Sequence, residues 1–248
     1  MRLANKVAIV TGAASGFGKG IAELFAREAA RVAVLDINAQ GAKDVAAGIG
    51  NNALAVTCDV TKRADIDAAV AATQKAFGTV DILINNAGWT HMRKSLLEVE
   101  EAELDRMLAI NVKSIFHFAQ AVVPLFKQKK GGVIINIGST AGIRPRPGLT
   151  WYNATKGAVN LVSKSMAVEL APDRIRVCAL APVIGETGLT SSFMGGDTPE
   201  LRAQFMASVP LGRMSTPRDV ANAALFLASD EADFLSGVVL EVDGGRCV

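Results

Sequence analysis

Seven short runs of apolar, mostly β-branched residues recur along the chain. They occupy residues 7–10, 32–35, 54–56, 82–84, 133–137, 175–180 and 238–242. Most of these runs are apolar at nearly every position rather than at alternate positions, which is typical of strands that are covered on both faces. The pattern therefore predicts seven buried strands.

The segments between these runs carry apolar residues at helical spacing. Ile21, Leu24 and Phe25 form one such stripe, and Leu104 and Leu108 belong to another. Alternation of strands and helices is typical of an α/β fold with right-handed crossovers. We therefore expect a doubly wound, seven-stranded parallel sheet with helices on both faces. Because no linker rich in Pro, Gly or Ser divides the chain, we expect residues 1–248 to form one domain.

Residues 186–199 depart from this alternation. The segment is rich in Gly, Ser and Thr, yet it contains Leu189, Phe193 and Met194. A surface loop and a mobile lid with an apolar inner face both fit this composition. We favour a lid around residues 186–206, because long loops in compact domains are more often functional.

The composition narrows the classes of partner. Half of the 248 residues are hydrophobic and 20% are charged, so the chain can bury a large core. The formal net charge is only +2, which argues against a nucleic-acid or membrane-surface partner. The apolar runs are also too short for a signal peptide or a membrane span, so we expect a cytoplasmic protein.

Cysteine and histidine are both scarce. The three cysteines, Cys58, Cys178 and Cys247, form no CxxC pair, which fits free thiols in a reducing compartment. The two histidines, His91 and His117, lack a cluster of further ligands. We therefore expect no metal site.

A glycine-rich turn follows the first predicted strand. Its sequence, TGAASGFG, occupies residues 11–18 and leads into the first predicted helix. Glycines permit a tight turn and let backbone amides approach a pyrophosphate at a helix N-terminus. A helix cap with close helix–strand packing is the alternative. The predicted cofactor contacts here are Gly12, Ser15, Gly16, Phe17 and Gly18.

Asp36 ends the second predicted strand, 18 residues after Gly18. A carboxylate at this place can accept hydrogen bonds from the ribose hydroxyls of a dinucleotide, and it repels a 2′-phosphate. The neighbouring positions offer no compensating cation, since they are Ser15 and Ile37. We therefore expect NAD(H) rather than NADP(H), with Asp36 and Ile37 beside the adenosine.

The chain contains a single tyrosine, Tyr152, and Lys156 follows it four residues later. This spacing places both side chains on one helix face. A cation beside a phenol favours the phenolate, so we expect Lys156 to lower the pKa of Tyr152. A phenol tuned in this way can act as a general acid or base.

These motifs together resemble those of the single-domain short-chain dehydrogenase/reductases. The resemblance extends over essentially the whole chain and ends at residues 242–245. It implies a Rossmann-type fold and reversible hydride transfer between NAD(H) and a secondary alcohol or ketone, without a metal. The motifs that carry it are TGxxxGxG, Asp36, Asp59-Val60, Asn85-Asn86-Ala87-Gly88, Asn111, Ser139 and Tyr152-xxx-Lys156.

The resemblance implies four catalytic residues. Tyr152 would exchange a proton with the substrate oxygen, and Ser139 would hydrogen-bond that oxygen. Lys156 would hold the nicotinamide ribose, while Asn111 would anchor a water in a proton relay through Lys156. Ordinary structural roles, such as a strand-end cap for Ser139, are the alternatives.

Further cofactor contacts follow from the same resemblance. Asp59 and Val60 would meet the adenine, and Asn86, Ala87 and Gly88 would line the cofactor channel. An additional group follows the sixth strand and would contact the nicotinamide carboxamide. This group consists of Pro182, Val183, Gly185 and Thr187.

One motif departs from the family pattern. The family usually has Asn-Pro-Gly after the sixth strand, whereas this chain has Ala181-Pro182-Val183. Valine does not readily adopt positive φ, so we expect an ordinary backbone conformation at Val183.

The expected substrate pocket is largely apolar with few charges, which favours a neutral secondary alcohol, ketone or polyol. We expect His91 at the surface or at the rim of this pocket rather than in a catalytic role, and Trp151 could instead point outward because adjacent helix positions do not share a face. The candidate walls are Trp89, His91, Thr140, Ile143, Trp151, Leu189, Phe193 and Met194.

Two alternative functions remain open. The overall pattern also resembles 3-oxoacyl-[acyl-carrier-protein] reductases, for which basic residues including Arg144 and Arg146 could form a docking surface. Asp36 argues against this reading, because reductases of that type commonly use NADPH. A non-catalytic NAD-binding scaffold or sensor is the alternative of another class.

In related proteins the helices at residues 111–123 and 153–170 form subunit contacts, so we expect a homotetramer, or else a dimer.

Overall fold

The computed structural model describes residues 1–248 and contains one seven-stranded sheet. Every neighbouring pair of strands is parallel, in the order β3-β2-β1-β4-β5-β6-β7. Each strand overlaps one of the seven predicted runs, which confirms the predicted sheet. The strands are β1 (Val7–Thr11), β2 (Arg31–Asp36), β3 (Ala53–Thr57), β4 (Ile82–Asn85), β5 (Gly132–Ile137), β6 (Ile175–Pro182) and β7 (Val239–Val242).

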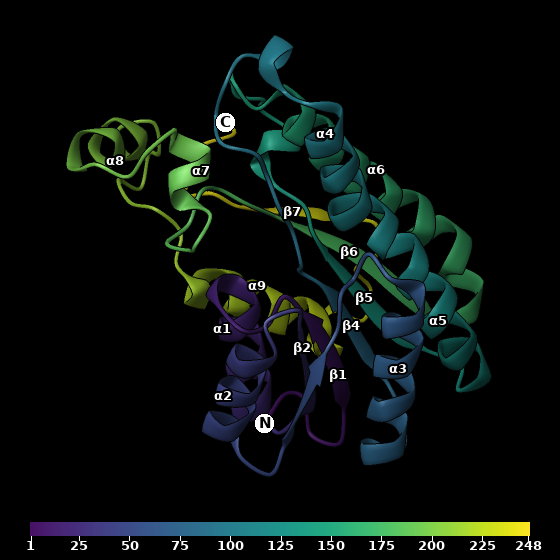
Figure 1. Ribbon diagram of the computed structural model, residues 1–248. Helices are drawn as coiled ribbons and strands as arrows, with labels where there is room; N and C mark the ends of the chain where they lie inside the picture. The colour runs from purple at the N-terminus through teal and green to yellow at the C-terminus, as the bar shows by residue number, and fades with distance from the viewer.

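Helices cover both faces of the sheet (Figure 1). The α-helices are α1 (Gly16–Arg27), α2 (Ala39–Ile49), α3 (Arg63–Phe77), α4 (Glu101–Leu108), α5 (Ser114–Gln128), α6 (Thr150–Leu170), α7 (Thr190–Met194), α8 (Pro199–Met206) and α9 (Pro217–Ala228). Shorter helical turns are η1 (Leu96–Glu98), η2 (Ala109–Lys113), η3 (Thr140–Gly142), η4 (Ala171–Asp173) and η5 (Asp230–Ala232).

Two large apolar cores lie on opposite faces of the sheet. One packs the strands against α1, α2 and α9, and the other packs them against α3, α5 and α6. Successive strand residues alternate between the two cores, so Ala8 and Val10 belong to the first and Ile9 to the second. This double covering explains why the strand sequences are apolar at nearly every position.

The direction of the crossovers reverses at β1, which lies between β2 and β4. The loops after β1 and β4 therefore leave in opposite directions and open a crevice at the carboxyl ends of the strands. Ligands bind at this kind of switch point in doubly wound sheets. The glycine-rich turn follows β1, and Asn86 directly follows β4, so both motifs lie at the crevice.

Helices α4 and α5 are joined through a π-helical turn, η2, which contains Asn111. The whole stretch Glu101–Gln128 is long and apolar enough to cross a membrane by length and composition alone. In this fold it covers the sheet, and Phe118, Val122 and Phe126 are fully buried in the core. Packing against the sheet accounts for these apolar side chains. Phe116, in contrast, is 55% exposed.

Residues 186–206 contain the two short helices α7 and α8, which project beside the carboxyl edge of the sheet (Figure 1). They pack around a small apolar cluster of their own. Its buried members are Val183, Met194, Phe205, Val209 and Met214. This cluster is separate from both large cores, but it includes Val183 after β6, and Phe193 of α7 packs against Tyr152 of α6.

Candidate active site

The glycine-rich turn has the backbone conformation that its sequence predicts. Gly12 and Gly16 adopt positive φ values of 62° and 53°, which disfavour a side chain. At Gly18 the constraint is contact, because a β-carbon there would lie 2.2 Å from the carbonyl oxygen of Gly12. Gly18 therefore lets α1 pack against the turn and does not itself line the cleft, contrary to its prediction as a cofactor contact.

The turn is braced from the neighbouring strand. The Asn86 Nδ2 donates to the carbonyl oxygens of Thr11 and Gly12, at 2.8 and 3.0 Å. The hydroxyl of Thr11 accepts hydrogen bonds from the amides of Asn86 and Ala87. Asn86 thus fixes the shape of the turn in addition to lining the cleft.

The N-terminus of α1 fits an anionic group. Its N-cap residue, Ser15, makes no side-chain capping hydrogen bond, and no acidic residue occupies the first turn. The amides of this turn are therefore without a side-chain acceptor, and the helix dipole favours negative charge beside them. A cofactor pyrophosphate is compatible with this place.

Asp36 is oriented by two backbone amides. Its Oδ2 accepts from Ala14 and its Oδ1 from Asn38, both at 2.9 Å. These contacts hold the carboxylate at the end of β2, on the cleft wall, where it can still accept hydrogen bonds from ribose hydroxyls. Ile37 beside it is 68% exposed and brings no cation to this end of the cleft.

A single cleft of about 470 Å³ brings together most of the predicted residues. It extends from the glycine-rich turn to the helices of the segment 186–206. The predicted cofactor and catalytic residues on its wall are Gly12, Ser15, Gly16, Phe17, Asp36, Ile37, Asp59, Val60, Asn86, Ala87, Gly88, Ser139, Tyr152, Lys156, Pro182, Val183, Gly185 and Thr187. Val183 has no positive φ, which confirms the ordinary backbone predicted there.

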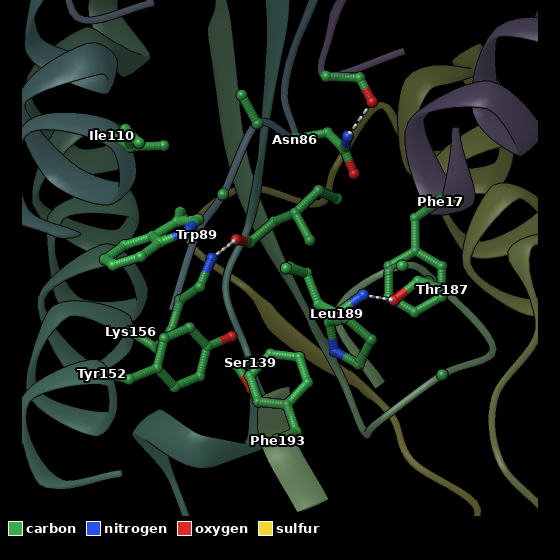
Figure 2. Close-up of a pocket in the computed structure, with 18 of the residues that line it drawn as sticks. Phe17, Asn86, Trp89, Ile110, Ser139, Tyr152, Lys156, Thr187, Leu189 and Phe193 are labelled. Carbon is green, nitrogen blue, oxygen red and sulfur yellow. Dashed lines mark hydrogen bonds between the residues drawn. The ribbon is translucent and has the colours of Figure 1, made fainter. Parts of the chain in front are cut away.

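Tyr152 and Lys156 lie on one face of α6, beside the end of β5 (Figure 2). Both side chains are buried, and the tyrosine hydroxyl is directed toward Ser139. The Lys156 Nζ donates to the carbonyl oxygen of Ile137 at 2.7 Å and lies 5.8 Å from the centre of the tyrosine ring. The ring of Phe193 packs edge-on against Tyr152, with 5.1 Å between centroids.

Burial dominates the ionisation of this pair. It raises the pKa of Tyr152 well above the ordinary value of 10.0, and hydrogen bonding by the Ser139 side chain opposes this effect only in part. Burial also lowers the pKa of Lys156 to about 8. The prediction that Lys156 depresses the pKa of Tyr152 is therefore wrong for the protein alone, because desolvation outweighs the distant cation.

Asn111 supports the site from behind the cleft wall. Its Oδ1 accepts from the amide of Trp89, and its Nδ2 donates to the Trp89 carbonyl oxygen, both at 2.9 Å. The Nδ2 also donates to the hydroxyl of Thr155 on α6 at 3.1 Å. A β-carbon built on Gly88 would lie 3.6 Å from both Asn111 Oδ1 and Lys156 Nζ, so the two groups flank the same glycine.

The expected substrate walls divide into two groups. Trp89, Thr140, Leu189 and Phe193 line the cleft, whereas four other candidates do not. Met194 belongs to the buried cluster of the 186–206 segment, and the indole of Trp151 donates outward to the carbonyl of Leu96. The loop after β4 buries His91, and Ile143 is 41% exposed outside the cleft.

His91 lies neither at the surface nor at the pocket rim, the two positions predicted for it, because it is only 2% exposed. Its Nδ1 lies 2.7 Å from the carbonyl oxygen of Met92, and its Nε2 has no hydrogen-bond partner. The local sequence could not reveal this burial, because it depends on how the loop after β4 folds back on itself. No group of three or more His, Cys, Asp or Glu is arranged to hold a metal ion.

Sequence reasoning also missed charged residues at the substrate end of the cleft. Arg106, Arg146 and Arg246 line it together with Phe205, so the expectation of a pocket with few charges is wrong. The sequence RPRP at residues 144–147 signalled a basic loop, but not one that turns inward. Arg246 lies two residues from the C-terminus, and only the tertiary fold brings it to the cleft.

The sheet topology, the glycine-rich turn and the tyrosine–lysine pair define a Rossmann-type oxidoreductase. A family model described as enoyl-(acyl carrier protein) reductase matches residues 12–246. The chain is 48% identical over 250 residues to 4-formylbenzenesulfonate dehydrogenase of Comamonas testosteroni, with 99% of each chain covered. It is 40% identical over 251 residues to 2,5-dichloro-2,5-cyclohexadiene-1,4-diol dehydrogenase of Sphingobium indicum, covering 100% of this chain and 98% of the relative.

A solved structure is also similar. The 3-ketoacyl-(acyl-carrier-protein) reductase of Brucella melitensis, complexed with NADH, has a TM-score of 0.95 and 47% identity, covering 99% of this chain and 100% of the relative. This protein belongs to the short-chain dehydrogenase/reductase family. The resemblance found in the sequence motifs is thereby confirmed, and so is the enzyme class.

Proposed function

We infer that the protein is an NAD(H)-dependent oxidoreductase that interconverts an alcohol and a carbonyl compound, with Tyr152 as the general acid and base. The observation that carries this inference is one continuous cleft. Its one end holds the glycine-rich turn and Asp36, and its other end holds Tyr152 beside Ser139. A cofactor lying along this cleft would bring its nicotinamide to the tyrosine.

The cofactor end favours NAD over NADP. The first turn of α1 offers uncapped amides to the pyrophosphate, and Asp36 offers its carboxylate to the ribose hydroxyls. The same carboxylate repels a 2′-phosphate, and no lysine or arginine lines this end to compensate. When bound, the nicotinamide supplies the hydride acceptor or donor.

The chain's own residues manage the proton and the orientation of the substrate. In alcohol oxidation Tyr152 takes the hydroxyl proton while the carbon loses its hydride, and in carbonyl reduction the tyrosine returns that proton. Ser139 hydrogen-bonds the reacting oxygen. Lys156 holds the ribose beside the tyrosine, and Asn111 anchors a water that links Lys156 to solvent. The family resemblance supports these roles, and the placement of the four side chains is compatible with them.

The substrate end favours a molecule that carries a ring. Trp89, Phe193 and Phe205 supply flat apolar surfaces along the cleft. The similar dehydrogenases of Comamonas and Sphingobium are named for ring compounds, an aromatic aldehyde and a cyclic diol. We therefore include aromatic primary alcohols and aldehydes beside the secondary alcohols and ketones.

A second candidate function is the reduction of 3-oxoacyl groups on an acyl carrier protein. Similarity to the Brucella reductase favours it, and that reductase is complexed with NADH. Asp36 and an NAD preference therefore do not argue against this function. The aromatic side chains and arginines of the cleft favour the first candidate, because an acyl chain offers them neither a ring nor an anion.

Subunit contacts and a lid belong to the same proposal. Phe116, Leu161 and Val168 are 55%, 66% and 80% exposed on α5 and α6, which supports a homotetramer built through these helices. Residues 186–206 act as a lid within a single domain, since they line the cleft and pack around a cluster that is separate from the two large cores. The three free cysteines fit a cytoplasmic enzyme.

A screen for NAD+ reduction tests the proposed function. Aromatic primary alcohols, secondary alcohols, polyols and 3-hydroxyacyl thioesters are compared at equal concentration, each with NAD+ and with NADP+. The proposal expects the largest kcat/KM for a ring-bearing alcohol with NAD+. A clear preference for 3-hydroxyacyl thioesters would support the second candidate, and NADP+ preference would refute the cofactor assignment.

A further inference from the structure

Charge is distributed unevenly along the cleft. The two carboxylates on its wall, Asp36 and Asp59, lie at the ends of β2 and β3, where the cofactor's adenosine is expected. Three arginines, Arg106, Arg146 and Arg246, also line the cleft. None of these arginines has a carboxylate within ion-pair distance, since the 11 ion pairs of the protein involve other residues. The substrate end therefore carries three cations that form no ion pair within the protein.

Arg146 is the cleft arginine whose guanidinium has a nitrogen shielded from water. It is partly buried, and its Nη1 is shielded from solvent without any hydrogen-bond partner. Burial lowers its pKa to about 10, and the nearby cations Arg246 and Arg93 contribute to this lowering. A shielded guanidinium nitrogen without an acceptor is costly in a folded protein, and binding sites are where such a cost is retained.

The surroundings of Arg146 hold the guanidinium but leave its donors free. Its central carbon lies 5.1 Å from the centre of the Phe205 ring, and that of Arg246 lies 5.7 Å from the same ring. Contact of a guanidinium with an aromatic ring stabilises the cation without using its N–H groups as hydrogen-bond donors. Arg144 donates to the carbonyl oxygen of Arg246, which ties the C-terminal tail to the loop of Arg146.

We propose that Arg146, assisted by Arg246, binds an anionic group on the substrate, and that the substrate is an aromatic alcohol or aldehyde carrying a sulfonate or carboxylate. A guanidinium can donate two parallel hydrogen bonds to either anion, and the Nη1 of Arg146 has no acceptor within the protein. The aromatic side chains of the cleft receive the ring between this anion and Tyr152. The proposal rests on the proposed function, whose substrate class it narrows.

A protein surface is a poorer occupant of this place. An acidic carrier protein would contact cations that reach into solvent, as Arg144 does, whereas Arg146 is partly buried on the wall of the cleft. A small anionic molecule that enters the cleft therefore fits this place better. Docking of a carrier protein on the exposed arginines is one of the outcomes that the experiment separates.

Matched substrates test the anion site. The probes are 4-(hydroxymethyl)benzenesulfonate, 4-(hydroxymethyl)benzoate and the neutral 4-(hydroxymethyl)benzenesulfonamide, each oxidised with NAD+. We expect the native enzyme to prefer the sulfonate or the benzoate over the sulfonamide by about tenfold or more in kcat/KM. In Arg146→Met this ratio should fall by about tenfold, and in Arg246→Gln by a smaller factor. Arg27→Met removes the same charge from the exposed end of α1 and should leave the ratio unchanged.

The outcomes keep the two proposals apart. Thermal unfolding checks that each variant is folded, and Arg146→Met should not lower the unfolding temperature because it removes a poorly compensated cation. Calorimetric binding of benzenesulfonate, which needs no turnover, should also be lost in Arg146→Met.

A native enzyme without preference for the anions, or a preference that survives in Arg146→Met, would overturn the anion site while the proposed function stands. Arg146-dependent binding of benzenesulfonate, without NAD+ reduction from these probes or from any alcohol of the screen above, would overturn the proposed function alone. If Arg146→Met impairs only carrier-protein-linked thioesters, the arginines serve docking and the anion site is refuted.

Discussion

The two ends of the cleft are built in different ways. At the cofactor end, a turn and two strand ends supply the contacts, and each group is held by backbone amides or by close backbone packing. At the substrate end, the wall comes from the loop of Arg146, from α7 and α8, and from the C-terminal tail. These segments are far apart in the sequence and meet only in the folded chain. The first end is set by local sequence, and the second by tertiary structure.

The same difference appears in the ionisation of the catalytic pair. The positions of Tyr152 and Lys156 follow from their spacing on one helix, so sequence predicts them together. Their pKa values depend instead on how deeply the fold buries them. The positions of the two side chains can therefore be predicted from the sequence. Their pKa values cannot, because these depend on desolvation in the folded protein.

The largest expected effect comes from removing the phenol hydroxyl at this junction. Tyr152→Phe should lower kcat by about two to four orders of magnitude, because a general acid and base is lost while the ring is retained. Binding of NADH, followed by its fluorescence, should change little. Retained turnover in the variant would show that another group transfers the proton.

A smaller effect should follow from changing the cofactor end alone. Asp36→Asn should lower kcat/KM for NAD+ by about tenfold, because the hydrogen bonds from the ribose lose a charged acceptor. Activity with NADP+ should rise relative to NAD+, since the repulsion of a 2′-phosphate is removed. Asp44→Asn is the control for charge, because Asp44 is exposed on α2 away from the cleft. An unchanged cofactor preference in Asp36→Asn would remove Asp36 from the site.

An effect on stability rather than on turnover should distinguish a packed glycine from an unconstrained one. Gly18→Ala should destabilise the protein by about 1–3 kcal/mol, because the new methyl group would collide with the carbonyl oxygen of Gly12. Gly48 lies within α2 with no atom near its missing side chain, so Gly48→Ala should stabilise the protein by about 0.5–1 kcal/mol. Denaturant unfolding measures both. Equal effects would mean that the contact at Gly18 does not constrain the turn.

Sequence reasoning therefore reached the sheet and most of the cofactor end. The strands were predictable because burial on both faces leaves continuous apolar runs, and the glycine-rich turn because its residues are adjacent. His91 and Met194 were misplaced because their burial depends on contacts between loops, which no periodicity records. Arg146 was noticed only as part of a basic surface, since a sequence does not show on which side of a loop a charge lies.

One measurement tests the central claim, that Tyr152 carries the proton, most directly. Because the chain has a single tyrosine, ultraviolet absorbance follows its ionisation without interference from another phenol. In the free protein the phenolate should appear only above the ordinary pKa of 10.0, since burial favours the neutral phenol. Bound NAD+ brings positive charge to the nicotinamide ring, so it should lower this pKa. Alcohol oxidation should then rise with pH as the phenolate forms, and carbonyl reduction should rise as pH falls. A phenol that titrates near 10 both with and without NAD+, while the rate of oxidation changes at another pH, would contradict the assignment of Tyr152 as the acid and base.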